Sequence, residues 1–305
     1  MNTQIKIGDL KLKNPVLVAS GTFGYAQEFS EYVNLKKLGG IITKTITLKP
    51  TQGNPPPRVV ETASGMLNAI GLQNEGVDKF VEEKMSFLRG LHVPIIVSIS
   101  AETQQEYVKL AKILNKTKGV DALELNISCP NVKDKRCLIY QDKNIISQLV
   151  KQIKSAVAKP VIVKLSPNVA DIVGIARAAE DAGGDAISLI NTILAMSIDI
   201  NTKTPRLGNI TGGLSGPAIK PIALRMVWQV AQNVDIPVIG MGGIMNANDA
   251  LEFMIAGASA VCVGTANLVD PAATEKVIKG IQNYLKKNKI SDINKLIGGL
   301  EIWQS

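Results

Sequence analysis

Short runs rich in valine and isoleucine alternate along this chain with longer stretches in which apolar and polar residues mix at helical spacing. Runs of the first kind are typical of strands buried in a parallel sheet, and stretches of the second kind are typical of amphipathic helices. The predicted strands are Pro15–Ala19, Gly40–Thr43, Pro94–Ile99, Ala122–Asn126, Pro160–Leu165, Ala186–Ile190, Pro237–Gly240 and Ala260–Gly264. The predicted helices are Glu28–Leu38, Gly76–Leu88, Thr103–Asn115, Asp142–Val157, Val169–Ala182, Pro217–Gln232, Ala247–Ile255 and Pro271–Leu285. Eight strand–helix units in succession predict an α/β fold, a (β/α)8 TIM barrel.

Three further segments complete this picture. Ile5–Leu12 alternates around a Gly-Asp pair, which predicts a short N-terminal hairpin that closes the bottom of the barrel. Thr45–Glu75 follows the second strand and Thr192–Gly216 follows the sixth, and both are longer than an ordinary βα connection. Because both leave the carboxyl ends of their strands, we expect them to fold over the same barrel mouth and to cover a bound ligand. The alternatives are a decoration without a ligand role or a subunit contact, for which the stiff segment Asn54–Arg58 is suited.

Length and composition narrow the class of protein. With 305 residues and 46% hydrophobic content the chain can bury a large core, and we expect residues 1–305 to form one domain. The N-terminus has no apolar signal core, and no stretch approaches the roughly 18 uncharged apolar residues of a membrane span, which predicts a cytoplasmic protein without a membrane partner. The net charge of +8 is dispersed and aromatic residues make up only 4%, so small anionic ligands are favoured over nucleic acid.

The residue types available for chemistry are also limited. A single histidine, His92, argues against a histidine-based triad and leaves cysteine, lysine, tyrosine or carboxylates as acid–base groups. The three cysteines, Cys129, Cys137 and Cys262, include no C-x-x-C pair. We therefore expect no metal site, no disulfide framework and no iron–sulfur cluster held by this chain alone.

Polar residues or glycine pairs follow almost every predicted strand. At or just past the strand ends stand Ser20, Lys44, Ser98, Asn126, Lys164, Asn191, Gly242-Gly243 and Gly264-Thr265. Stability alone does not explain lysines at a barrel mouth, because a buried unpaired ammonium costs several kcal/mol. Glycine turns after the seventh and eighth strands often build a phosphate site in such barrels. The pattern predicts a phosphorylated cofactor across the mouth, with Ser20, Lys44, Asn126 and Lys164 near its ring edges.

Two residues, Cys129 and Lys164, suggest specific chemistry. The stretch Glu124–Asn131 places Cys129 where a buried strand opens into a loop, between amide side chains that can hold a flat, oxygen-rich ligand. The Cys129 thiol is a candidate proton acceptor, and the alternative is a buried structural cysteine. Lys164, on a very apolar strand, would stabilise negative charge on the N1–C2 carbonyl edge of a reduced flavin. Its alternative is a lysine whose ammonium reaches solvent at the barrel mouth.

Five segments then carry a family resemblance. Asn68–Asn74, Asn126–Asn131, Val163–Pro167, Ile239–Gly243 and Val263–Thr265 resemble the signature segments of dihydroorotate dehydrogenases, in the right order and on the right barrel units. The resemblance runs from about Lys11 to Glu301. It implies one FMN per chain and oxidation of (S)-dihydroorotate to orotate in de novo pyrimidine (UMP) biosynthesis.

The resemblance also implies roles for individual residues. Cys129 would be the base that takes the C5 proton while hydride leaves C6 for flavin N5. The substrate-binding residues would be Lys44, Asn68, Ala69, Ile70, Gly71, Leu72, Asn126, Asn131, Asn191 and Thr192. The FMN-binding residues would be Ser20, Lys44, Thr45, Ser98, Asn126, Lys164, Ile190, Gly216, Gly242, Gly243, Gly264 and Thr265. We expect the loop Val132–Tyr140 to close over substrate.

The subclass follows from smaller features of the sequence. A cysteine stands at the base position and the barrel begins almost at once, unlike the membrane-associated, serine-based members of the family. Ala69–Asn74 and Ile127 resemble the NAD-linked class 1B catalytic subunit. That class implies a partner electron-transfer subunit carrying FAD and a [2Fe–2S] cluster, in a heterotetramer around a homodimer of this chain.

Several alternatives remain open from the sequence. The first is a fumarate-linked class 1A enzyme. The second is a flavin-dependent dihydropyrimidine or dihydrouridine reductase with Cys129 as acid, although no RNA-binding extension is visible. The third is a non-redox phosphate-binding isomerase or aldolase in which Lys164 forms a Schiff base. A non-catalytic scaffold would leave the convergent polar strand ends unexplained.

Overall fold

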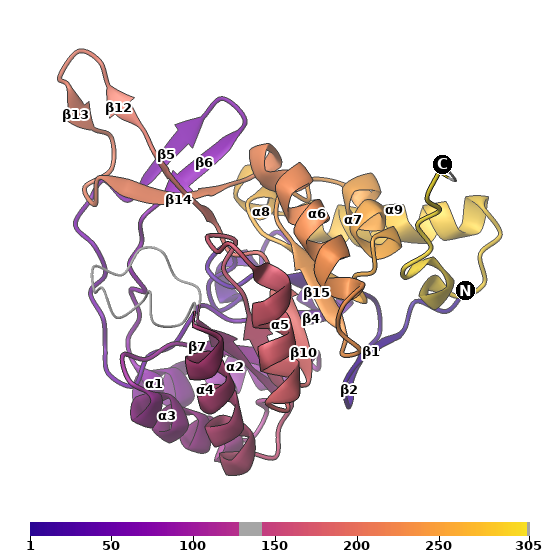
Figure 1. The fold of residues 1–305 in the computed structure, drawn as a ribbon, viewed down its shortest axis with the longest axis horizontal. Helices are drawn as coiled ribbons and strands as arrows, with labels where there is room; N and C mark the ends of the chain where they lie inside the picture. The colour runs from indigo at the N-terminus through magenta and orange to yellow at the C-terminus, as the bar shows by residue number, and fades with distance from the viewer. Residues whose placement is uncertain (128–141, 304–305) are drawn as a thin grey trace.

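Eight parallel strands form a closed barrel in the computed structural model, which describes residues 1–127 and 142–303 (Figure 1). Around the barrel the strands follow the order β10-β15-β16-β3-β4-β7-β8-β9. Their bounds are β3 Val16–Val18, β4 Gly40–Ile42, β7 Ile95–Ile99, β8 Ala122–Asn126, β9 Val161–Lys164, β10 Ala186–Leu189, β15 Val238–Met241 and β16 Ala260–Val263. Each strand lies where the valine- and isoleucine-rich runs predict it, and the (β/α)8 barrel is confirmed.

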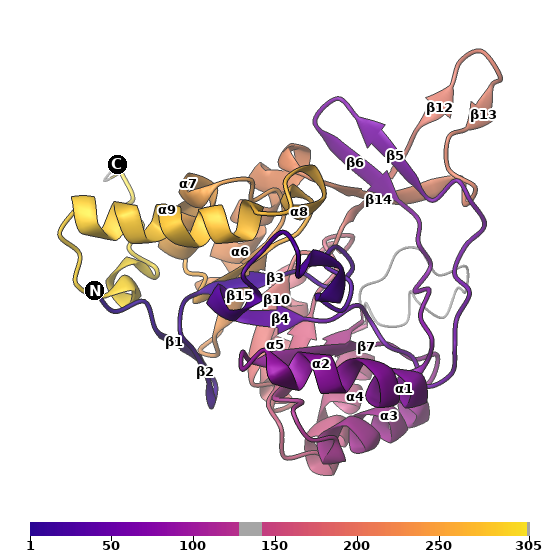
Figure 2. The same ribbon diagram turned by 180° about the vertical axis from the view of Figure 1, so that it is seen from behind.

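Helices pack around the outside of this barrel, as both views show (Figures 1 and 2). Their bounds are α1 Val77–Lys79, a π-helical turn Phe80–Lys84, α2 Met85–Gly90, α3 Gln104–Lys116, α4 Lys143–Ala156, α5 Ile172–Asp181, α6 Lys220–Ala231, α7 Ala247–Ile255, α8 Ala266–Val269 and α9 Ala273–Lys287. Short 3-10 turns add Pro217–Ile219 before α6 and Ile293–Leu296 after α9. Local sequence sets the helix starts: Thr103 and Asp142 cap α3 and α4, and Asn246 forms a capping box with Asp249 at α7.

One predicted helix is wrong. Glu28–Leu38 forms no α-helix but two separate 3-10 turns, Gln27–Phe29 and Leu35–Lys37. The Asn34 side chain accepts a hydrogen bond from the backbone N–H of Lys36 and starts the second turn there. A short polar side chain that bonds the local backbone in this way competes with a continuous helix.

Strands that the sequence pattern did not predict lie within the two long excursions. The first holds β5 Val59–Thr62 and β6 Gly65–Asn68, and the second holds β11 Ile193–Met196, β12 Ile198–Asp199, β13 Thr204–Pro205 and β14 Thr211–Ser215. Four of them pair in the order β11-β14-β6-β5, with Leu214 opposite Leu67. Figure 2 shows this sheet beyond one end of the barrel, so both excursions do fold over the same mouth.

The N-terminal hairpin is confirmed as well. β1 Ile5–Ile7 pairs antiparallel with β2 Leu10–Leu12, and both strands alternate between buried and exposed residues. Its Gly8 turn lies beside Asp185, just ahead of β10. The hairpin therefore lies at the amino ends of the barrel strands, away from the excursion sheet.

Candidate functional site

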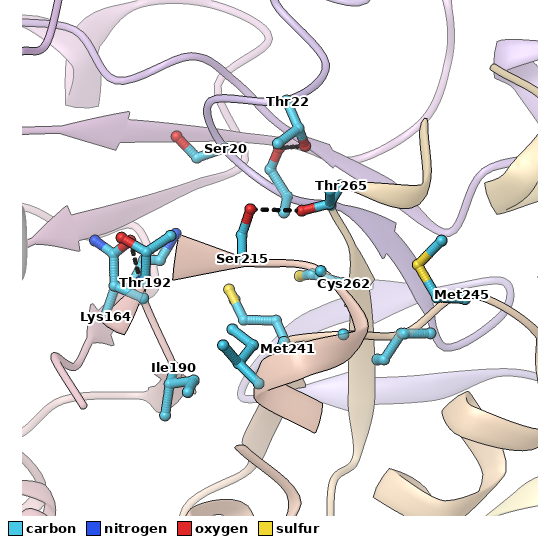
Figure 3. Close-up of a pocket in the computed structure, with 18 residues that line it drawn as sticks. Ser20, Thr22, Lys164, Ile190, Thr192, Ser215, Met241, Met245, Cys262 and Thr265 are labelled. Carbon is cyan, nitrogen blue, oxygen red and sulfur yellow. Dashed lines mark hydrogen bonds between the residues drawn. The ribbon is translucent and has the colours of Figure 1, made fainter. Parts of the chain in front are cut away.

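A cavity of ≈ 340 Å³ lies at the barrel mouth, between the carboxyl ends of the strands and the excursion sheet. A second recess of ≈ 70 Å³ adjoins it at the ends of β15 and β16 (Figure 3). Lys164, Asn191 and Thr192 line both spaces. The two therefore form one continuous site with a wide part and a narrow part.

Most residues predicted from the sequence meet in this site. The wide part is lined by Ser20, Lys44, Thr45, Asn68, Ile70, Gly71, Leu72, Asn126, Lys164, Asn191 and Thr192. The narrow part adds Ile190, Gly216, Gly242, Gly243, Gly264 and Thr265. Ser98 and Ala69 are fully buried behind the lining, at 0% exposure each. Cys129, Asn131 and the loop Val132–Tyr140 lie outside the described residues.

Thr45 joins three strand ends at the floor of the wide part. Its Oγ1 accepts a hydrogen bond from Asn126 Nδ2 at 3.0 Å. The same oxygen lies 3.0 Å from Ser98 Oγ and 3.2 Å from Ser20 Oγ. Ser98 thus acts from below the surface of the cavity, and through Thr45 it fixes the rotamer of an amide that lines it. Asn126 is 7% exposed, so its carboxamide is shielded from bulk solvent.

Lys164 is the strongest sign of a ligand. Its side chain comes from the end of β9, is 5% exposed and lines both parts of the site. Within the described residues it forms no hydrogen bond and no ion pair. Because a buried ammonium is costly unless a partner offsets it, an electron-rich group is expected above it. The carbonyl edge of a flavin fits this requirement.

Lys44 supplies a second cation to the wide part, after the end of β4. Burial lowers the pKa of this lysine, while the Glu28 and Glu75 carboxylates raise it and Arg58 lowers it further. The two carboxylates therefore favour the charged form of a half-buried ammonium. An anionic ligand in the wide part would meet Lys44 on this side.

The rim opposite the barrel includes an unusual backbone conformation. Gly71 has φ +74° and Leu72 has φ +60°, which is rare for a residue with a branched side chain. A Cβ at Gly71 would lie 2.7 Å from the backbone N of Asn54. Such conformations persist only where the surrounding structure holds them, and they gather at ligand sites.

The narrow part is made by glycine turns. Gly216, Gly242 and Gly243 all have positive φ, at 92°, 126° and 76°. Above them Thr265 Oγ1 donates to Ser215 Oγ at 2.9 Å (Figure 3). Glycine lets the backbone approach a ligand closely, and hydroxyls add donors, so this recess fits a phosphate group. Together with Lys164, the described residues fit a phosphorylated flavin.

Gly243→Ala tests this narrow part. A Cβ here would stand 2.7 Å from Lys220 Cβ and 2.8 Å from the Gly216 carbonyl oxygen, on a backbone with φ +76°. We expect a loss of roughly 1–3 kcal/mol in the free energy of unfolding and weaker FMN binding, measured by denaturant unfolding and by flavin titration of the apoprotein. Gly90→Ala is the matched control, because nothing lies within 4 Å of its Cβ position. Equal stability and flavin affinity in the two variants would contradict the assignment.

Some lining residues escaped the sequence reasoning. They are Gly21, Thr22, Gly24, Val59, Met66, Gln73, Ser215 and Leu268 in the wide part. Thr22 lies two residues after Ser20 and Ser215 directly precedes Gly216, so the turn sequences around these predicted positions carried a usable signal. Val59 and Met66 enter only through the pairing of the excursion strands, which strand-end reasoning does not address.

Two classes of feature are missing from the part of the chain that the structure describes. Within residues 1–127 and 142–303, no group of three or more histidine, cysteine, aspartate or glutamate side chains is placed to hold a metal ion. Over the same ranges, every helix is too short or too polar to cross a bilayer.

Comparison with known proteins identifies the family of this chain. Residues 2–285 match the family model described as dihydroorotate dehydrogenase. Proteins named dihydroorotate dehydrogenase B (NAD(+)), catalytic subunit, are similar over nearly the full length: that of Geotalea daltonii is 55% identical over 98% of both chains, and that of Geobacter metallireducens is 56% identical over 98% of both. The crystal structure of the Eimeria tenella enzyme in complex with ferulenol shares the fold, with a TM-score of 0.82, 22% identity and coverage of 98% of this chain and 88% of that one. The chain belongs to the dihydroorotate dehydrogenase family.

Proposed function

We propose that this protein is an FMN-dependent dihydroorotate dehydrogenase that oxidises (S)-dihydroorotate to orotate in pyrimidine biosynthesis in the cytoplasm. The observation that carries the proposal is the buried ammonium of Lys164, which faces the cavity without a partner among the described residues. Family membership supports it, since the family is flavin-dependent in general. Residues 1–305 would then form one FMN-binding domain.

The residues around the narrow part would hold the cofactor. Its phosphate would lie against the turns at Gly216, Gly242, Gly243, Gly264 and Thr265, and its ring against Ser20, Thr45, Asn126, Lys164 and Ile190. When bound there, FMN supplies the acceptor for hydride from C6 of the substrate. Lys164 contributes positive charge where negative charge develops on the ring, and because it is fixed and dry it needs little reorganisation.

The wide part suits dihydroorotate. Asn68, Asn126 and Asn191 offer carboxamides from three directions, and each is both a donor and an acceptor for the imide edge. Asn191 Nδ2 lies 3.5 Å from Asn126 Oδ1, and the Asn191 Oδ1 accepts from the backbone N–H of Thr192 at 2.8 Å, so these amides are oriented. Lys44 would meet the substrate carboxylate or lower the pKa of the Cys129 thiol by its charge.

Proton removal is assigned to Cys129. In the sequence this residue follows Asn126, the last residue of β8, by three positions. A thiolate is a reasonable base for the C5 proton next to a carbonyl when its pKa is near the working pH. Asn131 is proposed to bind substrate, and the loop Val132–Tyr140 that follows it in the sequence is proposed to cover substrate.

The electron acceptor is proposed to be NAD+, reached through a partner subunit with FAD and a [2Fe–2S] cluster, in a heterotetramer around a homodimer of this chain. Relatives named as NAD(+)-linked catalytic subunits at 54–56% identity support this. For the single chain we expect flavin that dihydroorotate has reduced to be reoxidised slowly by both fumarate and free NAD+. Stopped-flow absorbance after separate addition of each acceptor measures this.

Two outcomes of this experiment would contradict the proposed partner subunit. Efficient reoxidation by fumarate would show a self-sufficient, fumarate-linked enzyme and would remove the partner from the proposal. Fast reoxidation by NAD+ alone would also remove the partner, because the barrel would then bind the nicotinamide itself.

A further inference from the structure

A buried carboxylate lies beneath the site and has no role in the proposed reaction. Glu124 on β8 is 0% exposed. It stands two residues before Asn126, so both side chains point to the barrel interior. The strand register puts Asn126 beside Lys164 and Lys164 beside Ser188. Glu124 therefore lies one layer below the lysine.

Only one of the two oxygens of this carboxylate has a hydrogen-bond partner among the described residues. Ser188 Oγ donates to Glu124 Oε2 at 3.0 Å. Glu124 Oε1 is buried and has no hydrogen-bond partner, the one such side-chain atom among the residues that the structure describes. An unpaired buried oxygen is costly, so a native protein that keeps one needs a reason such as charge balance or a catalytic role.

A nearby thiol shows that Glu124 and Lys164 share one electrostatic environment. Burial raises the pKa of Cys262, the Glu124 carboxylate raises it further, and the Lys164 ammonium lowers it. Cys262 lies on the floor of the narrow part and forms no disulfide (Figure 3). Both opposite charges thus act on the same buried sulfur, although they form no direct ion pair among the described residues.

We propose that Glu124 is an ionised counter-charge to Lys164 that acts through this lysine to lower the reduction potential of bound FMN. Two opposite charges in adjacent layers stabilise each other across a medium of low dielectric constant. The carboxylate offsets part of the positive charge that Lys164 presents to the ring, and reduction adds negative charge there. Removing the carboxylate charge then favours the reduced ring. The inference rests on the proposed function, because it needs a flavin above Lys164.

Glu124→Gln tests the idea, because it removes the charge and keeps the shape and the acceptor for Ser188. We expect the ratio of the protein's affinity for reduced FMN to its affinity for oxidised FMN to rise about tenfold. This corresponds to a rise of roughly 30 mV in the reduction potential of a two-electron couple. Glu124→Asp is the matched control, since it keeps the charge and shortens the side chain, and we expect its ratio within about threefold of the wild type. Spectroelectrochemical titration of each holoprotein measures the potentials.

A second measurement needs neither flavin nor activity. Infrared spectra of FMN-free wild type minus each variant show which form of Glu124 is lost, and we expect the bands of an ionised carboxylate. If Glu124→Gln does not fold, the Glu124→Asp difference spectrum gives the same information.

Unchanged potential in Glu124→Gln, an equal shift in Glu124→Asp, or loss of a protonated-acid band would each overturn the inference. A wild type that binds FMN and accepts electrons from dihydroorotate keeps the proposed function intact in all three cases. A wild type that binds no FMN defeats the proposed function instead, and the infrared spectra then still decide the charge of Glu124.

Discussion

Lys164→Met is expected to slow reduction of the bound flavin by dihydroorotate roughly 10²–10³-fold, the loss typical when one fixed group that stabilises transition-state charge is removed. The reason is the position of the ammonium: it is 5% exposed, faces the cavity and has no partner among the described residues. Methionine has similar volume without the charge. The variant leaves the buried Glu124 carboxylate without its proposed counter-charge, and loss of one partner of a buried charge pair is destabilising, so the FMN-free variant should unfold at a lower temperature than the wild type.

Lys159→Met is the matched control. Lys159 stands five residues earlier, ahead of the same strand, and donates to the Val120 backbone carbonyl far from the mouth. We expect normal flavin reduction in this variant. Anaerobic stopped flow at saturating dihydroorotate gives the rates, and thermal unfolding of the apoproteins gives the stabilities. A Lys164→Met enzyme that reduces its flavin at the normal rate would show that the lysine serves packing alone.

Cys129→Ala is expected to keep FMN and to oxidise dihydroorotate at least about a hundredfold more slowly, as when a general base is removed. FMN should remain bound because most of the residues proposed to hold it, such as Gly243 and Lys164, lie on other barrel units. The measurement is the single-turnover rate of flavin bleaching, with bound FMN counted from visible absorbance.

Cys137→Ala is the control for loss of a thiol from the same segment. It should bleach at nearly the wild-type rate, because no base role is assigned to Cys137. Near-normal flavin reduction in Cys129→Ala would remove the base assignment, and a carboxylate or lysine of the mouth would have to take its place.

The barrel could be predicted from sequence because its strands are short, mostly apolar and buried on both faces. Val161–Lys164 and Ala260–Val263 fall inside their predicted ranges for this reason. The excursion sheet could not be predicted in the same way. β14 holds two glycines and pairs with β6 from the other excursion, more than a hundred residues away, so no local period marks it. The segment Glu28–Leu38 failed for the opposite reason, since local side-chain bonds at Asn34 overrode a helical pattern.

The site, too, could be predicted only in part. The carboxyl ends of parallel barrel strands meet at one mouth, so residues at strand ends such as Lys44, Asn126 and Lys164 could be grouped without a structure. Contacts one layer deeper could not be predicted. The contact of Ser98 with Thr45 depends on strand register and side-chain rotamers. The same is true of the unpaired Glu124 oxygen below Lys164. The sequence shows which polar residues lie on the strands, but only the packed structure shows which atoms they contact.

We expect this chain alone to carry electrons from dihydroorotate to bound FMN. Anaerobic mixing of the FMN-loaded chain with dihydroorotate, followed by visible absorbance and by orotate formation, tests it most directly. The flavin should bleach, with one orotate formed per FMN and without any partner protein. A flavin that stays oxidised in the presence of saturating dihydroorotate, or a chain that cannot be loaded with FMN, would contradict it.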